Sequence, residues 1–303
     1  RRHGERPPRS VTLDLAAAPH APMLAPLMHQ GWGPALLPWV AFYGLVYGAA
    51  WVLGPLLLPH CRKLEPPARA YWASSVTSTV NSFVLTPLAW RACEQSELLS
   101  LQTSFTVSTH LSTSACVGMV GYTLWDSLLL FRYRAHWSSV RLYAVHHAGS
   151  ILAWGLCAVS GYAHVIAVPA LLFEATAPFV NGRYFLATAG LKESLLYRVN
   201  GVLMFLSFFV VRIVFNWWLY LSRFWWQREL LWQLPPAIVV TFNCLFPVNL
   251  ALQMLWFVKI AKGLLAVLSR CHADGLRDRE LLVTREELEY EAVAKRDGEG
   301  ESM

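Results

Sequence analysis

The sequence predicts an all-α, polytopic membrane protein with six or seven transmembrane helices around a polar-lined interior cavity. Three observations lead to this prediction. Of the 303 residues, 55% are hydrophobic and only 15% are charged, whereas a soluble domain usually carries about 25% charged residues. The charges gather at the chain ends and in short segments between long apolar runs. Most runs reach about 20 residues, the length at which a helix crosses a hydrocarbon core of about 30 Å.

Seven windows of the sequence are long enough to form such spans. The first, residues 35–58, carries prolines near both ends, where a missing backbone hydrogen bond costs least. The second, residues 71–90, is rich in Ser and Thr, which favours a helix buried among other helices over one that faces lipid. A short turn at Gly161 predicts a tight hairpin between the fourth and fifth spans. The later windows are residues 107–131, 140–160, 162–180, 200–221 and 237–268.

Lys and Arg residues alternate between the loops in a pattern that predicts the orientation of the chain. The loops after the first, third and fifth spans carry Arg62, Lys63 and Arg69, then Arg132, Arg134 and Arg141, then Arg183, Lys192 and Arg198. The other loops carry fewer. Because cytoplasmic loops collect Lys and Arg, the alternation favours seven spans with the C-terminus in the cytosol, where Lys259, Lys262 and Arg270 follow the last helix.

Composition divides the chain into four segments. Residues 1–32 are rich in Pro, Arg and Ala without apolar periodicity, which is typical of a disordered or upstream-translated leader, with Met23 or Met28 as a plausible start. The other segments are a first transmembrane helix with a basic loop (33–70), the main membrane domain (71–269) and a charged cytoplasmic tail (270–303).

Few ionisable residues lie inside the predicted spans, and these are the candidate site residues. A charged residue at the centre of a bilayer costs about 2.5–3.5 kcal/mol on insertion scales, so each should face the protein interior or a water-filled cavity. They are His110, Asp126, His146, His147, Glu174 and Arg212.

The side chains of the adjacent residues His146 and His147 point about 100° apart on a helix, so only one of them can point directly at a single ligand. An imidazole can act as a general base or nucleophile towards an acyl group, bind a lipid head group, or be hydrogen-bonded within the bundle. These alternatives stay open at this point. No Cys or Asp lies three or four residues beyond either histidine, so we expect no metal site, and no cofactor is indicated.

The remaining candidates also allow more than one arrangement. Asp126 can orient an imidazole from across the bundle, or it can pair with Arg212 to neutralise both charges. Glu174 lies four residues before Pro178, where a proline-broken helix frees backbone groups and can open a pocket. Arg212 and Asn216 share one helix face, and an arginine there can hold a phosphate or carboxylate head group.

Together these residues resemble the TLC (TRAM-LAG1-CLN8) domain family over roughly residues 72–269. The most specific anchor is the pattern E-x-[ST]-x-P-F-x-N-x-R-[WY]-F, which runs from Glu174 to Phe185 and contains Asn181 and Arg183. Further anchors are Gly121-Tyr122 with Asp126, the pair His146-His147, Asn200-Gly201, the run from Phe208 to Ile213 with Arg212, and Trp256 with Lys259 to Gly263.

The resemblance implies a multi-spanning protein of the endoplasmic reticulum or another endomembrane, concerned with lipid synthesis, transport or sensing. In the ceramide synthases of this family, paired histidines and a later pair of aspartates line a cavity where an acyl chain passes from acyl-CoA to a sphingoid base. His146 and His147 match the histidine pair, whereas residues 168–174 offer only Glu174 in place of the aspartates. Asn81 also stands where similar sequences tend to carry a histidine.

Our leading hypothesis is a protein of membrane lipid homeostasis that binds, senses or moves a lipid or acyl chain. Its predicted lipid-binding residues are His146, His147, Glu174, Asn181, Arg183 and Arg212. The alternative is an acyl-CoA-dependent sphingoid-base N-acyltransferase, with acyl-CoA as co-substrate and with His146, His147 and Asp126 as catalytic residues. A transporter is less favoured because no inverted repeat is visible. No nucleic-acid partner is expected, since no basic window carries exposed aromatic residues, and a homodimer is a further possibility.

Overall fold

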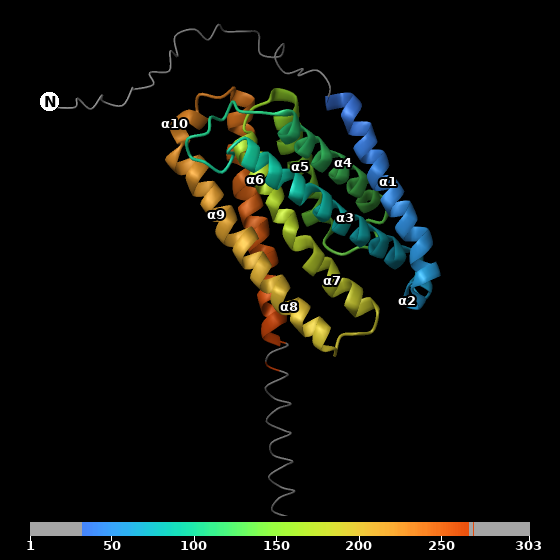
Figure 1. Ribbon diagram of the computed structural model, residues 1–303. Helices are drawn as coiled ribbons and strands as arrows, with labels where there is room; N and C mark the ends of the chain where they lie inside the picture. Colours follow the sequence, from blue (N-terminus) through green and yellow to red (C-terminus); the bar gives the residue numbers. More distant parts are fainter. Residues whose placement is uncertain (1–31, 267–268, 270–303) are drawn as a thin grey trace, which may run out of the picture.

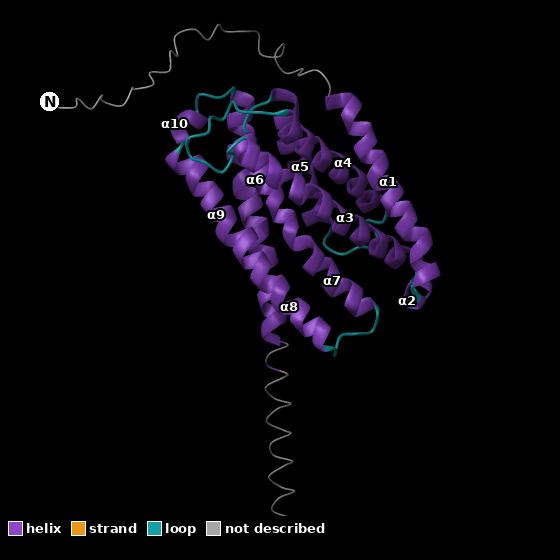
Figure 2. Ribbon diagram, in the orientation of Figure 1, coloured by secondary structure: helices purple, strands orange, loops and turns teal. Residues whose placement is uncertain are grey.

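The computed structural model describes residues 32–266 and 269, which fold into a bundle of long helices (Figures 1 and 2). Within these residues the structure has no strand. The first elements are α1 (Trp32–Leu57), α2 (Pro59–Arg62), α3 (Pro66–Gln95), α4 (His110–Arg132) and α5 (Val140–Ser160). The next long helix joins α6 (His164–Ala170), the 3₁₀ turn η3 (Leu171–Thr176) and α7 (Ala177–Thr188).

The following helix is continuous but irregular, and two short π-helical segments interrupt it. It joins α8 (Leu195–Ser207), the π-helix η4 (Phe208–Val214), α9 (Phe215–Tyr220) and the π-helix η5 (Leu221–Trp226). After the short α10 (Arg228–Leu231), the described chain ends with a long helix over Pro236–Ala266, here termed the final helix.

Six of the described helices are long and apolar enough to cross a membrane, which confirms an all-α, multi-pass membrane protein. They are Gly33–Leu57, His110–Arg132, Val140–Ser160, His164–Thr188, Leu195–Trp226 and Pro236–Ala266. The predicted leader (1–32), except Trp32, and the predicted charged tail (270–303) lie outside the described residues, as do Met23 and Met28.

Among the described long helices, α3 is the one that is not apolar enough to count among the six candidate spans. Its 30 residues extend for about 45 Å at 1.5 Å per residue, which is long enough to cross the hydrocarbon core. It packs against α1, α4, η3 and α7, and Figure 1 shows it in the middle of the bundle. Ser74, Ser75 and Thr77 are buried in these contacts. The Ser/Thr-rich window therefore forms a helix enclosed by other helices, as predicted.

The predicted hairpin turn is present. α5 ends at Ser160, and the chain reverses over residues 161–163 before α6 begins. Gly161 has φ +73°, a left-handed conformation that only glycine adopts without steric cost. The sequence thus locates this turn through Gly161, although Ala163 in the same turn also has a left-handed backbone, with φ +60°.

One helix, Leu195–Trp226, is longer than predicted at both ends. The sixth long helix starts at Leu195 rather than residue 200, because the hydroxyl of Ser194 caps it by accepting a hydrogen bond from the backbone N–H of Tyr197 at 3.2 Å. It continues past Leu221 to Trp226, so that Arg223 lies inside the helix and is fully buried.

Both terminal nitrogens of the buried Arg223 have hydrogen-bond partners, two of them in the loop that follows α3, whereas its Nε is buried without a partner among the described residues. Its Nη2 donates to the carbonyl oxygens of Leu98 at 2.8 Å and Ser100 at 3.1 Å, and its Nη1 donates to Oε1 of Gln227 at 2.6 Å. A charged group is tolerated there because loop carbonyls replace the water that it loses. The contact fixes this end of the bundle.

As far as the structure describes it, the final helix agrees with its predicted window of residues 237–268, but two basic residues expected to follow it lie inside it. Lys259 and Lys262 lie within Pro236–Ala266 and do not follow the helix, while Arg270 lies outside the described residues. Both lysines remain exposed, since a long Lys side chain can carry its ammonium group away from an apolar helix surface. The prediction that Lys259 and Lys262 follow the last helix was therefore wrong.

Candidate functional site

Most of the predicted site residues surround one cavity of about 290 Å³, here termed the polar cavity. Its walls come from α3, α4, α5, α7, η3, η4 and the final helix. The predicted residues that line it are Asp126, His146, His147, Glu174, Asn181 and Arg212. His110 does not belong to it, because it is the exposed first residue of α4 and not an interior residue as predicted.

His147 is held against Asp126. Its Nε2 lies 3.5 Å from Oδ2 of Asp126, and the hydroxyl of Ser74 donates to Oδ1 of the same carboxylate at 2.6 Å. Nδ1 of His147 lies 3.3 Å from the hydroxyl of Ser127. Of the two arrangements that the sequence left open for Asp126, the structure contains the one in which this carboxylate orients an imidazole.

His146 has different surroundings. Its ring packs edge-on against Trp256, with ring centroids 5.3 Å apart and an angle of 84° between the ring planes. Among the described residues, neither ring nitrogen of His146 has a hydrogen-bond partner. The two adjacent rings thus face different neighbours, as the helical geometry predicted, and His146 is the one whose nitrogens are left for a ligand.

A second cavity of about 200 Å³, here termed the apolar cavity, lies on the other side of His146. Its walls are mainly aliphatic and aromatic side chains from α5, α6 and the final helix. They include Ala153, Trp154, Ile166, Phe173, Phe242, Leu245, Phe246 and Leu252. His146 lines the polar cavity, the apolar cavity and a small cavity of about 10 Å³ between them. The two larger cavities therefore meet at this imidazole.

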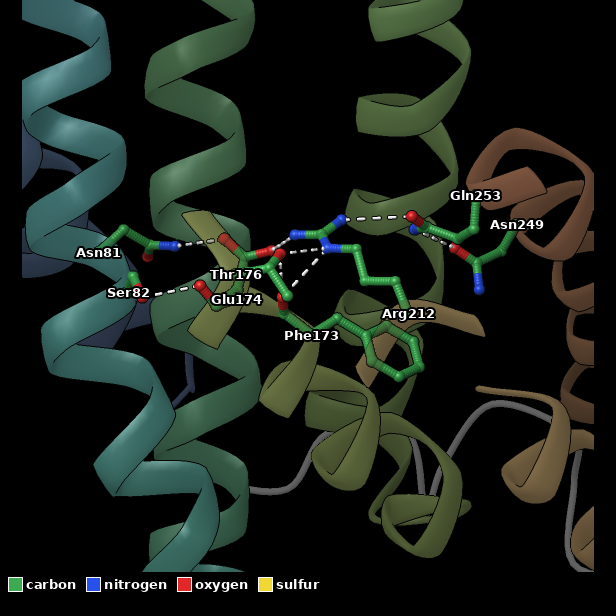
Figure 3. Close-up of polar contacts among 8 residues, drawn as sticks. All are labelled: Asn81, Ser82, Phe173, Glu174, Thr176, Arg212, Asn249 and Gln253. Carbon is green, nitrogen blue, oxygen red and sulfur yellow. Dashed lines mark hydrogen bonds and ion pairs between the residues drawn. The ribbon is translucent and has the colours of Figure 1, made fainter. Parts of the chain in front are cut away.

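Opposite the histidines, Arg212 and Glu174 form an ion pair inside the bundle (Figure 3). Nη2 of Arg212 lies 3.3 Å from Oε1 of Glu174. Nε of Arg212 also donates to the hydroxyl of Thr176 at 2.7 Å and to the carbonyl oxygen of Phe173 at 3.1 Å. Arg212 pairs with Glu174 and not with Asp126, so both carboxylates of the cavity have a cationic or imidazole partner.

The backbone around Glu174 explains why polar side chains gather there. Pro178 has no N–H, so the carbonyl oxygen of Glu174 cannot receive the usual helical hydrogen bond. That oxygen instead accepts hydrogen bonds from the backbone N–H of Ala177 and from the hydroxyl of Ser82 on α3, the latter at 2.7 Å. A proline in a membrane helix is tolerated when a neighbouring helix satisfies the freed carbonyl in this way. The proline thus draws α3 towards the 3₁₀ turn that carries Glu174.

The ion pair is extended on both sides by side-chain amides (Figure 3). Nδ2 of Asn81 donates to Oε2 of Glu174 at 3.1 Å, and the hydroxyl of Tyr43 donates to Oδ1 of Asn81 at 2.8 Å. On the other side, Nη1 of Arg212 lies 3.4 Å from Oε1 of Gln253. Asn81 therefore has a hydrogen-bond partner on each side, Glu174 and Tyr43.

Asn181 and Arg183 separate in the structure. Asn181 lines the polar cavity and donates to the hydroxyl of Thr79 at 3.0 Å. Arg183 lies outside this cavity and stacks on Tyr197, with its guanidinium carbon 4.3 Å from the ring centroid. Residues two positions apart on a helix point about 200° apart, so the two residues cannot serve one site as the sequence pattern suggested.

Several residues of the polar cavity were missed by the sequence analysis. Tyr71, Ser74, Ser75 and Ser78 of α3 have the spacing i, i+3, i+4 and i+7, which places them on one helix face. This spacing was a usable signal, although Ser and Thr in a membrane helix are more often read as packing residues. Tyr143, Trp256 and Lys259 also line the cavity, and no spacing within one helix predicts them.

The fold and the site define a multi-pass membrane protein whose helices enclose a cavity lined by a histidine pair, two carboxylates and an arginine. The chain belongs to the TLC (TRAM-LAG1-CLN8) domain family, whose sequence profile matches residues 71–262. The pattern from Glu174 to Phe185 is most similar to the branch called TLC domain-containing protein 4.

Relatives from three organisms agree with this assignment. Human TLC domain-containing protein 4 is 29% identical over 168 residues, which cover 52% of this chain and 60% of the human protein. An uncharacterized TLC domain-containing protein of Schizosaccharomyces pombe is 24% identical over 245 residues, or 81% of each chain. TLC domain-containing protein 4 A of Dictyostelium discoideum is 24% identical over 220 residues, covering 69% of this chain and 80% of the relative. No solved structure matches the chain.

Proposed function

We propose that this protein binds a membrane lipid or an acyl chain and takes part in membrane lipid homeostasis as a carrier, sensor or trafficking component. The observation that carries the proposal is the meeting of a polar and an apolar cavity at His146. A lipid has one polar and one apolar end, so its head group would occupy the polar cavity and its chain the apolar one. Sites with apolar walls and a few placed polar groups are typical of small-molecule binding.

The polar cavity offers both hydrogen-bond donors and acceptors to a head group. Arg212 and Lys259 are donors, the carboxylate of Asp126 is an acceptor, and the imidazole of His146 can be either. Because Arg212 is already paired with Glu174, the cavity as a whole carries little excess charge. It therefore suits the hydroxyl, amide or ester groups of a lipid better than a highly charged ligand.

The second candidate is an acyl-CoA-dependent N-acyltransferase, and the unpartnered ring nitrogens of His146 favour it. Such an imidazole can remove a proton from an attacking amine or accept an acyl group. The carboxylate of Asp126 would then hold the second imidazole, that of His147, in position. Glu174 is the only carboxylate in residues 168–174, and its oxygens bond to Asn81 and Arg212, which leaves no second free carboxylate for proton transfer.

Replacing His146 and His147 together by Ala is expected to abolish co-purification of the bound lipid. Both imidazoles line the polar cavity, and His146 also forms its border with the apolar cavity. Mass spectrometry of lipids extracted from the purified chain would measure the loss. The matched control is His110→Ala with His136→Ala, which removes two exposed histidines outside the cavities.

Unchanged lipid content in the cavity variant would refute the binding role. The same preparations, supplied with labelled acyl-CoA and a sphingoid base, separate the two candidates. A labelled amide formed by the native chain and not by the cavity variant would establish the acyltransferase. Bound lipid without turnover would favour the carrier or sensor.

We further propose that the protein resides in the endoplasmic reticulum or another endomembrane with its C-terminus in the cytosol. Together with α3, the described part contains seven long helices, and in Figure 1 α1 begins at the opposite end of the bundle from the end of the final helix. Protease protection of tags on the two ends of the chain should place them on opposite sides of the membrane. Both tags on one side would show that α3 does not cross.

A further inference from the structure

A third cavity of about 210 Å³ lies between α7, α8 and the final helix, and three cationic side chains surround it. They are Arg183, Arg198 and Lys259, and no carboxylate is among the lining residues. In the described part of the chain, none of the three forms an ion pair. Three like charges around one space repel each other, and a bound anion would relieve that repulsion. We term this cavity the basic pocket.

The guanidinium of Arg183 is held in place with its N–H groups free. It stacks on Tyr197 at 4.3 Å, and stacking leaves the in-plane N–H donors uncovered. Gly201 allows this position, because a Cβ there would lie 2.9 Å from Nη1 of Arg183. Neither Arg183 nor Lys259 donates a hydrogen bond to any residue that the structure describes. Arg198 makes a single such bond, from Nη2 to the carbonyl oxygen of Glu193 at 3.3 Å.

The pocket lies near the ends of its helices, at the level expected for lipid head groups. Arg183 precedes the end of α7 at Thr188, and Arg198 follows the start of α8 at Leu195. At 1.5 Å per residue, both lie within about 10 Å of a helix end, which is the depth of the interfacial region. Met204 and Leu264 give the same pocket an apolar wall.

We propose that the basic pocket binds the phosphate of an anionic phospholipid from the surrounding membrane. The three cations would hold the phosphate and the charged head group, with Arg183 offering a bidentate contact. The apolar wall and the position at the membrane interface favour a phospholipid over free phosphate, which has no apolar part. Anionic lipids are concentrated in the cytoplasmic leaflet, and basic pockets between membrane helices on that side bind their head groups. Lys259 also lines the polar cavity, whereas Arg183 and Arg198 line the basic pocket and not the polar cavity. The test therefore replaces these two arginines and leaves the walls of the polar cavity unchanged.

The test titrates the purified full chain in detergent with phosphatidylserine, phosphatidylcholine and inorganic phosphate, and native mass spectrometry measures the bound fraction. Arg183→Gln with Arg198→Gln removes two of the three cations and no residue of the polar cavity. We expect the variant to bind phosphatidylserine at least about tenfold more weakly, since each cation near an anionic lipid contributes roughly a fivefold change in affinity. The matched control, Lys192→Gln with Lys262→Gln, removes two exposed lysines that do not line the pocket, and it should bind as the native chain does.

Each outcome decides the proposal. Arg183→Lys with Arg198→Lys keeps both charges and should retain the preference for phosphatidylserine, which separates a lost site from a lost fold. If the control variant binds phosphatidylserine as weakly as the pocket variant does, general surface charge explains the binding and the proposal is wrong. Equal affinity for phosphatidylserine and phosphatidylcholine would also overturn it. If inorganic phosphate binds as tightly as phosphatidylserine, the pocket is a site for a free anion. Replacing His146 and His147 tests the polar cavity separately. If that variant loses its bound lipid but keeps the preference for phosphatidylserine, the lost lipid belonged to the polar cavity and the proposal for the basic pocket stands.

Discussion

Replacing Glu174 by Leu is expected to destabilise the folded protein by about 3–5 kcal/mol, the usual cost of leaving one partner of a buried ion pair without the other. The guanidinium of Arg212 would keep its bonds to Phe173 and Thr176 but lose its counter-charge. Asn81 would also lose the acceptor of its Nδ2 group. Thermal unfolding of the purified chain in detergent, at a fixed lipid concentration, would measure the loss.

The double variant Glu174→Leu with Arg212→Met tests whether the charge itself is the cause. It removes both members of the pair, so it should recover a substantial part of the stability that the single variant loses. Glu94→Leu serves as the control, because Glu94 is exposed and forms no ion pair with a described residue. If the double variant is as unstable as the sum of the two single variants, the ion pair does not hold this part of the bundle.

The second large effect is expected at Gly121, where α4 approaches α1. A Cβ at this position would lie 2.6 Å from Cβ of Trp39 and 3.3 Å from its carbonyl carbon. These atoms belong to the α1 backbone or are bonded directly to it, so no change of rotamer relieves the clash. Gly121→Ala should therefore push the two helices apart, at a cost of about 1–3 kcal/mol. Small residues serve this purpose widely in membrane helices, because they allow close backbone contact.

Gly48→Ala provides a control of opposite sign. Gly48 also lies within a helix, but a Cβ there would have no atom within 4 Å. Alanine favours the helix by roughly 0.5–1 kcal/mol over glycine, so this variant should unfold at the same or a higher temperature. If Gly121→Ala and Gly48→Ala shift the unfolding temperature in the same direction, the contact between α1 and α4 is not close-packed.

Much of the fold is predictable because lipid leaves a chain few choices. In the hydrocarbon core every backbone N–H and C=O group needs an internal partner, so a long apolar run must be a helix. The predicted runs consequently become the observed helices, and Gly161 becomes the hairpin turn. The errors fall at polar helix ends. Lys259 lies inside a helix because its long, exposed side chain can carry its charge away from the apolar surface. Arg223 lies inside a helix because two loop carbonyl oxygens accept hydrogen bonds from its guanidinium.

Apart from His110, which is the exposed first residue of α4, the sequence by itself determined which ionisable residues of the spans face the interior of the bundle. The reason is that an ionisable side chain in an apolar helix has no favourable position in lipid. The sequence did not determine how those side chains pair. Only the tertiary structure placed Asp126 against His147 and Arg212 against Glu174, and only the tertiary structure moved Arg183 into a separate pocket. The physical reason is that pairing depends on the rotation and depth of each packed helix. Hydropathy along one helix carries no information about the angle at which its neighbour lies.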